Sequence, residues 1–314
     1  MNNQISYTIV VPVYKNTETL EELLLRLEDL NSQLSSVLEV VFVIDGSPDN
    51  SGNFLRKELP KFDFKSQLVE HSRNFGAFAA IKTGLSISSG EYVSVMAADL
   101  QEPISLTVQI FEKLQTNQFD VVVGRRISRD DPRMSRLASA VFWSLYRQLI
   151  NPDVPRGGVD MFGCNRKVIQ QLIKLNESHS SLIGMLFWVG YRRCTVPYVR
   201  QARKKGKSAW TFRKKISYLL DSIFSFTNLP LIVLTFLGVL GVAFTFVAGL
   251  FVFISWLSGS ISEPGYTPIV LAILFSTFML MASVGTVGMY VWRTYENSKN
   301  RPGAIVMSVE KINS

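Results

Sequence analysis

The chain combines a long region of alternating apolar and polar segments with a C-terminal region that is almost continuously apolar. Two runs in the second region, Leu229 to Leu257 and Thr267 to Trp292, contain 29 and 26 residues without a charged side chain. About 20 apolar residues suffice for a helix to cross the ~30 Å hydrocarbon core of a bilayer. The pattern predicts a hairpin of two membrane spans rather than two buried core helices.

Upstream of the hairpin, short apolar runs alternate with amphipathic stretches. Strands are predicted at Ser6 to Val13, Leu38 to Ile44, Gln67 to Val69, Tyr92 to Met96 and Val121 to Val123. Helices are predicted after Asn16, where leucines recur at helical spacing, and at Asn53 to Leu59, Ala77 to Ser86, Leu106 to Gln115 and Arg136 to Ile150. Strands and helices that alternate in this way form a mostly parallel sheet covered on both faces. The fold class is therefore α/β and Rossmann-like.

These patterns divide the chain into four parts. We expect an α/β domain over residues 1–212, a juxtamembrane helix over 213–228, the hairpin over 229–293 and a tail over 294–314. The juxtamembrane segment starts with basic residues and continues with apolar ones at helical spacing, namely Ile216, Leu219, Leu220, Ile223 and Phe224, with Phe226 beside them. It is typical of a helix lying in the membrane surface, although a core helix has the same pattern.

The net charge of +8 comes from one short segment. Eight of the 33 basic residues lie between Arg200 and Lys215, where no acidic residue occurs, and the other 25 equal the 25 acidic residues in number. Nucleic acid would suit such a run. Its position directly before a span favours anionic lipid or a lipid phosphate instead, and we expect no nucleic-acid partner.

Charges near the spans also predict the orientation. Basic residues precede the first span and follow the second, whereas the connecting loop carries only Glu263. Because Lys and Arg near a span tend to stay cytoplasmic, we expect a multi-pass protein of the inner (plasma) membrane with the α/β domain and both termini in the cytoplasm.

Several common sites are disfavoured. Cys164 and Cys194 are too few and too far apart for a disulfide framework or a cysteine metal site. The first turn lacks the glycine-rich motif of dinucleotide-binding folds. Gly206-Lys207-Ser208 lacks the first glycine of a phosphate loop, and His71 and His179 are isolated, so neither histidine is assigned to metal binding or catalysis.

Two predicted strands run directly into carboxylates. The second strand ends at Asp45 and the fourth is followed by Asp99. Ligands of open α/β sheets bind at the carboxyl ends of the strands, so these residues are candidates for a binding site.

The full order of motifs is more specific than any one of them. It comprises residues 11–16 (VPVYKN), 43–49 (VIDGSPD), 72–76 (SRNFG), 98–103 (ADLQEP), 203–210 (RKKGKSAW) and the terminal hairpin. This order resembles the family 2 glycosyltransferases of the GT-A fold, in particular the polyprenyl-phosphate glycosyltransferases that include bactoprenol glucosyltransferases and dolichol-phosphate mannose synthases. The resemblance covers nearly the whole chain.

The resemblance implies a nucleotide-sugar site and a metal ion. Donor binding would involve Pro12, Val13, Tyr14, Asp45, Arg73, Ala98 and Asp99. Asp99 and Asp160 would be the catalytic residues and would hold Mg²⁺ or Mn²⁺, which offsets the negative charge on the leaving diphosphate. Two positions depart from the family pattern, because Ala97 replaces the first Asp of its metal motif and Phe162 replaces a common Arg.

The resemblance also implies a lipid acceptor held by the basic segment. Arg203, Lys205, Lys207 and Ser208 match the region that binds acceptor phosphate, with Ala209 in place of a common Lys. A phosphate monoester has a second pKa near ~6 and is already largely deprotonated at pH 7, so its attack needs no strong general base. We expect direct in-line attack with inversion and without a covalent enzyme intermediate.

The resulting hypothesis is inverting transfer of a sugar from a nucleotide, UDP before GDP, to polyprenyl (undecaprenyl) phosphate. Two alternatives stay open at this point: a processive polysaccharide synthase, and a catalytically impaired, membrane-anchored nucleotide-sugar binder. The resemblance further implies a homo-oligomer, with a tetramer as one candidate.

Overall fold

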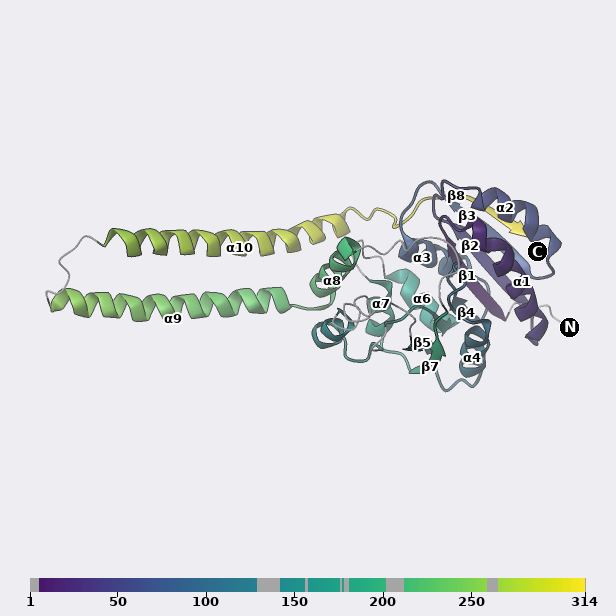
Figure 1. Cartoon of the computed structure of the whole chain (residues 1–314), viewed down its shortest axis with the longest axis horizontal. Coiled ribbons are helices and arrows are strands. Elements are labelled where there is room, and N and C mark those ends of the chain that lie inside the picture. Colours follow the sequence, from purple (N-terminus) through teal and green to yellow (C-terminus); the bar gives the residue numbers. More distant parts are fainter. Residues whose placement is uncertain are drawn as a thin grey trace.

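The computed structural model describes residues 6–128, 142–155, 158–175, 177, 181–201, 212–258 and 265–313. Among these residues, one eight-stranded sheet forms the α/β domain, and two long helices extend from it as a hairpin (Figure 1). The α/β class and the two long apolar helices predicted from the sequence are confirmed.

The sheet is mixed, with the order β7-β5-β6-β4-β1-β2-β3-β8. The strands are β1 (Tyr7–Val13), β2 (Leu38–Ile44), β3 (Lys65–His71), β4 (Tyr92–Val95), β5 (Val121–Ser128), β6 (Phe162–Asn165), β7 (Arg193–Val199) and β8 (Val306–Ile312). Strands β1 to β4 form the parallel centre, and β5 pairs with β7 in parallel. Antiparallel pairing adds β6 between β4 and β5, and β8 at the edge beside β3.

Helices cover both faces of this sheet. The helices α1 (Thr17–Gln33), α2 (Ser51–Glu58) and α4 (Ile104–Gln115) bury leucine-rich faces in one core. The helices α3 (Ala77–Ile87), α6 (Arg166–Lys174) and α7 (Leu182–Trp188) form the second core with residues 142–150. Strands β1 and β2 contribute alternate residues to the two cores, which explains why both sequences read as continuous apolar runs.

The hairpin consists of α9 (Leu229–Leu257) and α10 (Tyr266–Ser298). The first helix has the predicted bounds, and the second extends six residues beyond the predicted end at Trp292. Their apolar side chains are largely exposed, for example Phe244 and Phe278 at 72% each. Both helices contain a segment long and apolar enough to cross a membrane, by length and composition. Exposed apolar surface of this extent is stable in lipid rather than in water.

Helix α8 (Phe212–Phe226) joins the domain to the hairpin and has two different faces. Tyr218, Leu219 and Phe226 pack against the second core. The Phe226 ring lies so close to Gly184 that a Cβ at position 184 would come within 2.3 Å of it. Ile216 and Leu220 are exposed on the other side. The helix therefore has both a core face and an apolar outer face.

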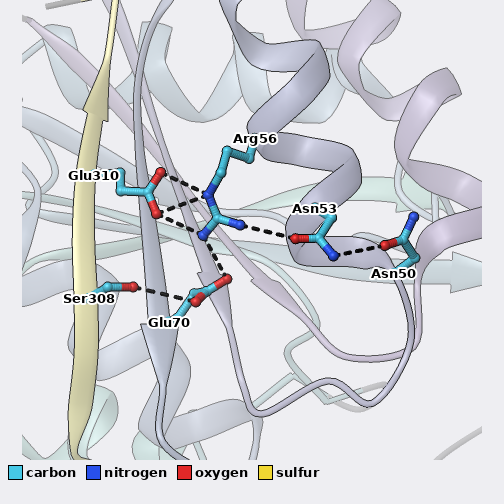
Figure 2. A network of polar contacts seen from close by, with 6 residues as sticks. All are labelled: Asn50, Asn53, Arg56, Glu70, Ser308 and Glu310. Atoms are coloured by element: carbon cyan, nitrogen blue, oxygen red, sulfur yellow. Dashed lines mark hydrogen bonds and ion pairs between the residues drawn. The ribbon is translucent and has the colours of Figure 1, made fainter.

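The chain returns to the α/β domain after the hairpin, because β8 pairs antiparallel with β3 over six residue pairs. Figure 2 shows the polar network that secures this strand. Arg56 of α2 donates to both carboxylate oxygens of Glu310, at 2.7 and 2.9 Å, and to Glu70 at 3.1 Å. Ser308 donates to Glu70 and Asn313 donates to the carbonyl of Phe62. Within the segment expected as a tail, residues 306–312 are thus an integral strand of the sheet.

The hairpin is also tied to α8 at its domain end. Arg293, on the last turns of α10, pairs with Asp221 at 2.8 Å and donates to Ser225 at 3.1 Å. The α/β domain is therefore in contact with α8, which precedes the first long helix, and with β8, which follows the second.

Candidate active site

The carboxyl ends of β1 to β4 meet at one edge of the sheet because these strands are parallel. The loops that leave this edge carry residues 14–16, 45–49, 72–76 and 97–102. Gly46 has a positive φ of 57°, and a Cβ there would lie 2.3 Å from the backbone carbon of Arg73. The close approach of the loops after β2 and β3 thus requires a glycine.

Asp45 holds those two loops together from inside. Its side chain is buried, at 2% exposure, and its carboxylate accepts hydrogen bonds from the backbone of Phe75 at 2.8 Å and Gly76 at 2.7 Å. The ring Nδ1 of His71 lies 2.9 Å from the same carboxylate. Burial opposes ionisation, but the hydrogen bonds from His71 and the loop outweigh it and lower the pKa of Asp45.

The loop after β1 is linked to the loop after β2 in a similar way. The backbone N–H of Lys15 donates to Ser47, and Ser47 donates to Asp49. Asp49 also accepts hydrogen bonds from the backbone and hydroxyl of Thr17 at the start of α1. Burial raises the pKa of Asp49, but these hydrogen bonds outweigh it, and the net direction is downward.

The predicted donor residues differ in accessibility. Tyr14 and Arg73 are exposed, Pro12 is intermediate, and the guanidinium of Arg73 lies 4.0 Å from the centre of the Phe75 ring. The side chains of Val13 and Ala98 are buried in the first core. Tyr14, Pro12 and Arg73 can therefore meet a ligand directly, whereas Val13 and Ala98 support the loops that carry them.

The second group of residues gathers around Asp160, in the segment before β6. Its carboxylate forms an ion pair with Arg126 of β5, accepts a hydrogen bond from the Tyr198 hydroxyl at 2.7 Å and lies 3.7 Å from Arg200. Tyr198 belongs to β7, and Arg200 follows that strand. Strands β5 and β7, which are far apart in the chain, thus bring three side chains to one carboxylate.

Glu102 joins this group to Asp99. It is 4% exposed, its Oε1 lies 3.6 Å from Nε of Arg200, and neither carboxylate oxygen accepts a hydrogen bond within the described part of the chain. Burial raises its pKa to about 8, and the negative charges of Asp99 and Asp160 act in the same direction, whereas Arg200 and Arg126 oppose them. Asp99 and Asp160 therefore both lie near enough to Glu102 to influence its charge.

Arg200 is positioned by the loop that contains Asp99. It donates to the side chain of Gln101 at 2.8 Å, and the backbone N–H of Gln201 donates to the carbonyl of Gln101 at 2.9 Å. Gln101 in turn donates through its backbone N–H to Asp99 at 3.3 Å. The start of the basic segment is therefore fixed beside the carboxylates.

The structure adds site residues that the sequence pattern does not indicate. Arg126 lies three residues beyond the end of the predicted fifth strand, and Tyr198 lies in a strand that was not predicted. Arg200 was identified only as one of several basic residues. Along β7 the apolar residues Val196 and Tyr198 stand two positions apart, which is the spacing of one strand face and was the available sequence signal for Tyr198.

Other residues singled out from the sequence lie in the core or outside the described part of the chain. Phe162 is buried in the second core, so its side chain makes no contact with a ligand at the surface. Arg203, Lys205, Lys207 and Ser208 lie outside the described residues, as does His179. The two cysteines are free, with Cys164 buried, where burial raises the pKa of its thiol.

The acidic residues of the site suit a divalent cation that is coordinated partly by the protein and partly by oxygens of a substrate. The described residues contain no group of three or more His, Cys, Asp or Glu side chains able to hold a metal by themselves. Mg²⁺ commonly takes one or two carboxylates, with phosphate and water oxygens completing its shell. Asp99 and Asp160 supply carboxylate oxygens of the kind that Mg²⁺ prefers, and the Asp160 carboxylate also pairs with Arg126.

The structure has an α/β sheet with acidic and basic side chains at the carboxyl ends of its parallel strands, which is where open α/β folds bind their ligands. Residues 8–173 match the family model described as Glycosyl transferase family 2. The chain therefore belongs to the family 2 glycosyltransferases.

Curated relatives match over almost the full length. An uncharacterized glycosyltransferase, YkcC, of Bacillus subtilis is 30% identical over 98% of this chain and 94% of its own length. The bactoprenol glucosyl transferase of Shigella phage SfV is 29% identical over 95% of this chain and 97% of its own. Among solved structures, glucosyl-3-phosphoglycerate synthase from Mycobacterium tuberculosis, in complex with Mn²⁺, UDP and phosphoglyceric acid, is 19% identical over 64% of this chain and 72% of that chain, with a TM-score of 0.49.

Proposed function

We propose that this glycosyltransferase moves a sugar from a nucleoside diphosphate, with UDP as the first candidate, to undecaprenyl or a related polyprenyl phosphate. The reaction would take place at the cytoplasmic face of the membrane. The convergence of Asp99, Glu102 and Asp160 with two arginines at the ligand edge of the sheet carries this proposal. The bactoprenol acceptor named for the phage relative supports the choice of lipid.

The donor would lie across the loops after β1, β2 and β3. Tyr14 and Pro12 would contact the base, and Asp45 belongs to the same predicted site. Arg73 is exposed on the loop that Asp45 secures, where its guanidinium can pair with the diphosphate. A divalent cation held by Asp99, with Asp160 beside it, would neutralise charge on the departing nucleoside diphosphate.

The acceptor would enter from the side of the basic segment. Arg200 brings the start of this segment to the carboxylates, and Arg203, Lys205, Lys207 and Ser208 follow within eight residues of it. A phosphate monoester near pH 7 already carries the negative oxygen that attacks the anomeric carbon. No side chain then has to remove a proton, and direct attack from the opposite side inverts the anomeric configuration.

The hairpin would keep the site close to the lipid. Helix α8 packs on the domain and exposes Ile216 and Leu220, and Arg293 ties the last turns of α10 to α8. These contacts support a domain held against the membrane surface, where a phosphate on a long isoprenoid chain can be reached. The predicted homo-oligomer remains part of the proposal without an assigned interface.

The test uses membranes containing the full chain, undecaprenyl phosphate, Mg²⁺ or Mn²⁺ and a panel of radiolabelled UDP- and GDP-sugars. We expect one sugar to appear in a lipid-phosphate product with inverted anomeric configuration. Asp99→Asn should lower the rate on the order of a hundredfold, since the lost charge stabilisation amounts to several kcal/mol.

The matched control is Asp63→Asn, which changes an exposed Asp before β3, at the opposite edge of the sheet. It should retain the wild-type rate. Nucleotide-sugar binding without transfer from any donor would instead favour the impaired binder. A product that grows by repeated sugar addition would favour the processive synthase.

A further inference from the structure

His71 occupies a position that the reaction scheme above does not use. It ends β3, is 3% exposed, and lies between two other elements. Its Nδ1 lies 2.9 Å from Asp45 at the end of β2, and its Nε2 lies 2.9 Å from the hydroxyl of Thr83 on α3. Both ring nitrogens therefore have side-chain partners, the buried Asp45 and the partly buried Thr83.

The direction of these hydrogen bonds follows from Asp45. An ionised carboxylate only accepts hydrogen bonds, so Nδ1 of His71 carries the hydrogen and donates a hydrogen bond to Asp45. In the neutral ring, Nε2 then accepts from the Thr83 hydroxyl. The ring is thereby held in one orientation, and it restricts the position of the Asp45 carboxylate.

The same carboxylate determines where the next loop lies. It accepts the backbone N–H groups of Phe75 and Gly76, while the N–H of Ser72 donates to the carbonyl of Ile305 just before β8. The loop over residues 72–76 is thus attached at both ends. Arg73 projects from it and lies against Phe75, whose ring stands edge-on to His71.

We propose that His71 is a positioning residue for the donor: through Asp45 and Thr83 it holds loop 72–76, and with it Arg73, in the conformation that receives the nucleotide diphosphate. When the loop is already ordered before binding, less conformational entropy is lost as the ligand binds, and the affinity is higher. This inference rests on the proposed function for the identity of the donor. It assigns no proton transfer to His71.

The test compares three variants with a matched control. His71→Leu removes both hydrogen bonds at similar volume, His71→Asn keeps a donor toward Asp45, and Thr83→Val removes only the second contact. The control, Thr8→Val, removes a buried hydrogen bond of 2.7 Å to Glu39 at the start of β1, where the strands begin. It should lower stability without touching the loop.

For His71→Leu we expect the donor KM, and the Kd for UDP or GDP with Mg²⁺, to rise about tenfold or more, as for the loss of a hydrogen bond to a buried charge. The acceptor KM should stay within twofold, and kcat should change less than KM. Hydrogen exchange should become faster at the amides of Phe75 and Gly76. Most of the donor affinity should return in His71→Asn, and Thr8→Val should leave it unchanged.

Unchanged donor KM and amide exchange in His71→Leu would overturn the proposal, as would an equal rise of donor and acceptor KM. If His71→Leu does not fold, Thr83→Val decides. A raised donor KM in Thr83→Val supports the positioning role of His71, and an unchanged donor KM excludes it. Failure of the proposed function would look different, because the wild-type protein would then transfer no sugar, whereas amide exchange would still report whether His71 orders the loop.

Discussion

Glu102 shows how one side chain in this site depends on its surroundings. Its position three residues after Asp99 suggests a turn residue, yet it is buried with Asp99 and Asp160 on one side and two arginines on the other. Burial and like charges favour the neutral acid, and a pKa of about 8 follows. The charge of the site therefore changes within the neutral pH range.

This pKa makes stability depend on pH. Between about pH 4.5 and 8, folded Glu102 keeps a proton that the unfolded chain has lost, so its contribution to stability decreases as the pH rises through this window. The total amounts to something on the order of 4 kcal/mol. Glu102→Gln should remove this dependence and raise the thermal midpoint relative to wild type at pH 8, measured in detergent with EDTA.

The control for this measurement is the exposed Glu21→Gln on α1, whose midpoint should follow that of the wild type at every pH. If the curves for Glu102→Gln and wild type stay parallel from pH 5 to 8.5, Glu102 ionises normally in the folded protein.

At the scale of elements, β8 is the least obvious part of the fold. Its sequence, VMSVEKI, mixes apolar and polar residues without strict alternation, and all seven residues are at least partly exposed. Among the described residues it pairs only with β3, and Arg56 bridges Glu310 and Glu70 across the pair. The strand links the end of the hairpin to the part of the sheet that leads into His71 and the donor loop.

Arg56→Met should therefore destabilise the attachment of β8. The ion pairs are partly exposed, so the loss should be on the order of 1 kcal/mol and should shrink at high salt. Hydrogen exchange should increase selectively at the backbone amides of β8. Arg26→Met, which breaks the single pair with Glu22 on α1, serves as the control and should have a smaller effect with no change at β8.

Faster exchange spread evenly over the domain would contradict a local role for Arg56. Equal losses of stability in Arg56→Met and Arg26→Met would show that pairing with two carboxylates stabilises the protein no more than pairing with one.

At the scale of the whole molecule, the path of the chain limits the arrangement in a membrane. The α/β domain precedes α9, and β8 follows α10 and pairs with β3 of the same domain (Figure 1). A strand cannot pair across a bilayer, so both ends of the hairpin must be on one side if α9 and α10 span it. The distribution of basic residues then favours the cytoplasmic side.

Cysteine labelling of intact cells tests this topology. In a Cys194→Ser background, an impermeant maleimide should label Ser260→Cys in the loop between the spans without permeabilisation. Ser35→Cys on the α/β domain and Gly303→Cys before β8, both at exposed positions, should react only after permeabilisation. Reaction of Ser35→Cys and Gly303→Cys from opposite sides would contradict the return of the chain to the sheet.

The local pattern of side chains was enough to predict the parallel centre of the sheet and the hairpin. Strands β1 and β2 are buried on both faces, so nearly every residue is apolar, and α9 has the length and composition that a lipid environment demands. Asp45 and Asp99 were predicted as site residues because a polar residue shortly after a buried strand lies at the ligand edge of the sheet. These features depend only on neighbours along the chain.

Tertiary structure alone determined how the site is completed and how the hairpin is attached. Arg126, Tyr198 and Arg200 meet Asp160 because β5, β6 and β7 converge from distant parts of the sequence, and β8 finds β3 only after the chain has passed through both long helices. Such contacts depend on strand order and register, which are set by the packing of the whole domain. Local composition therefore indicates where a ligand binds, and long-range pairing decides which side chains surround it.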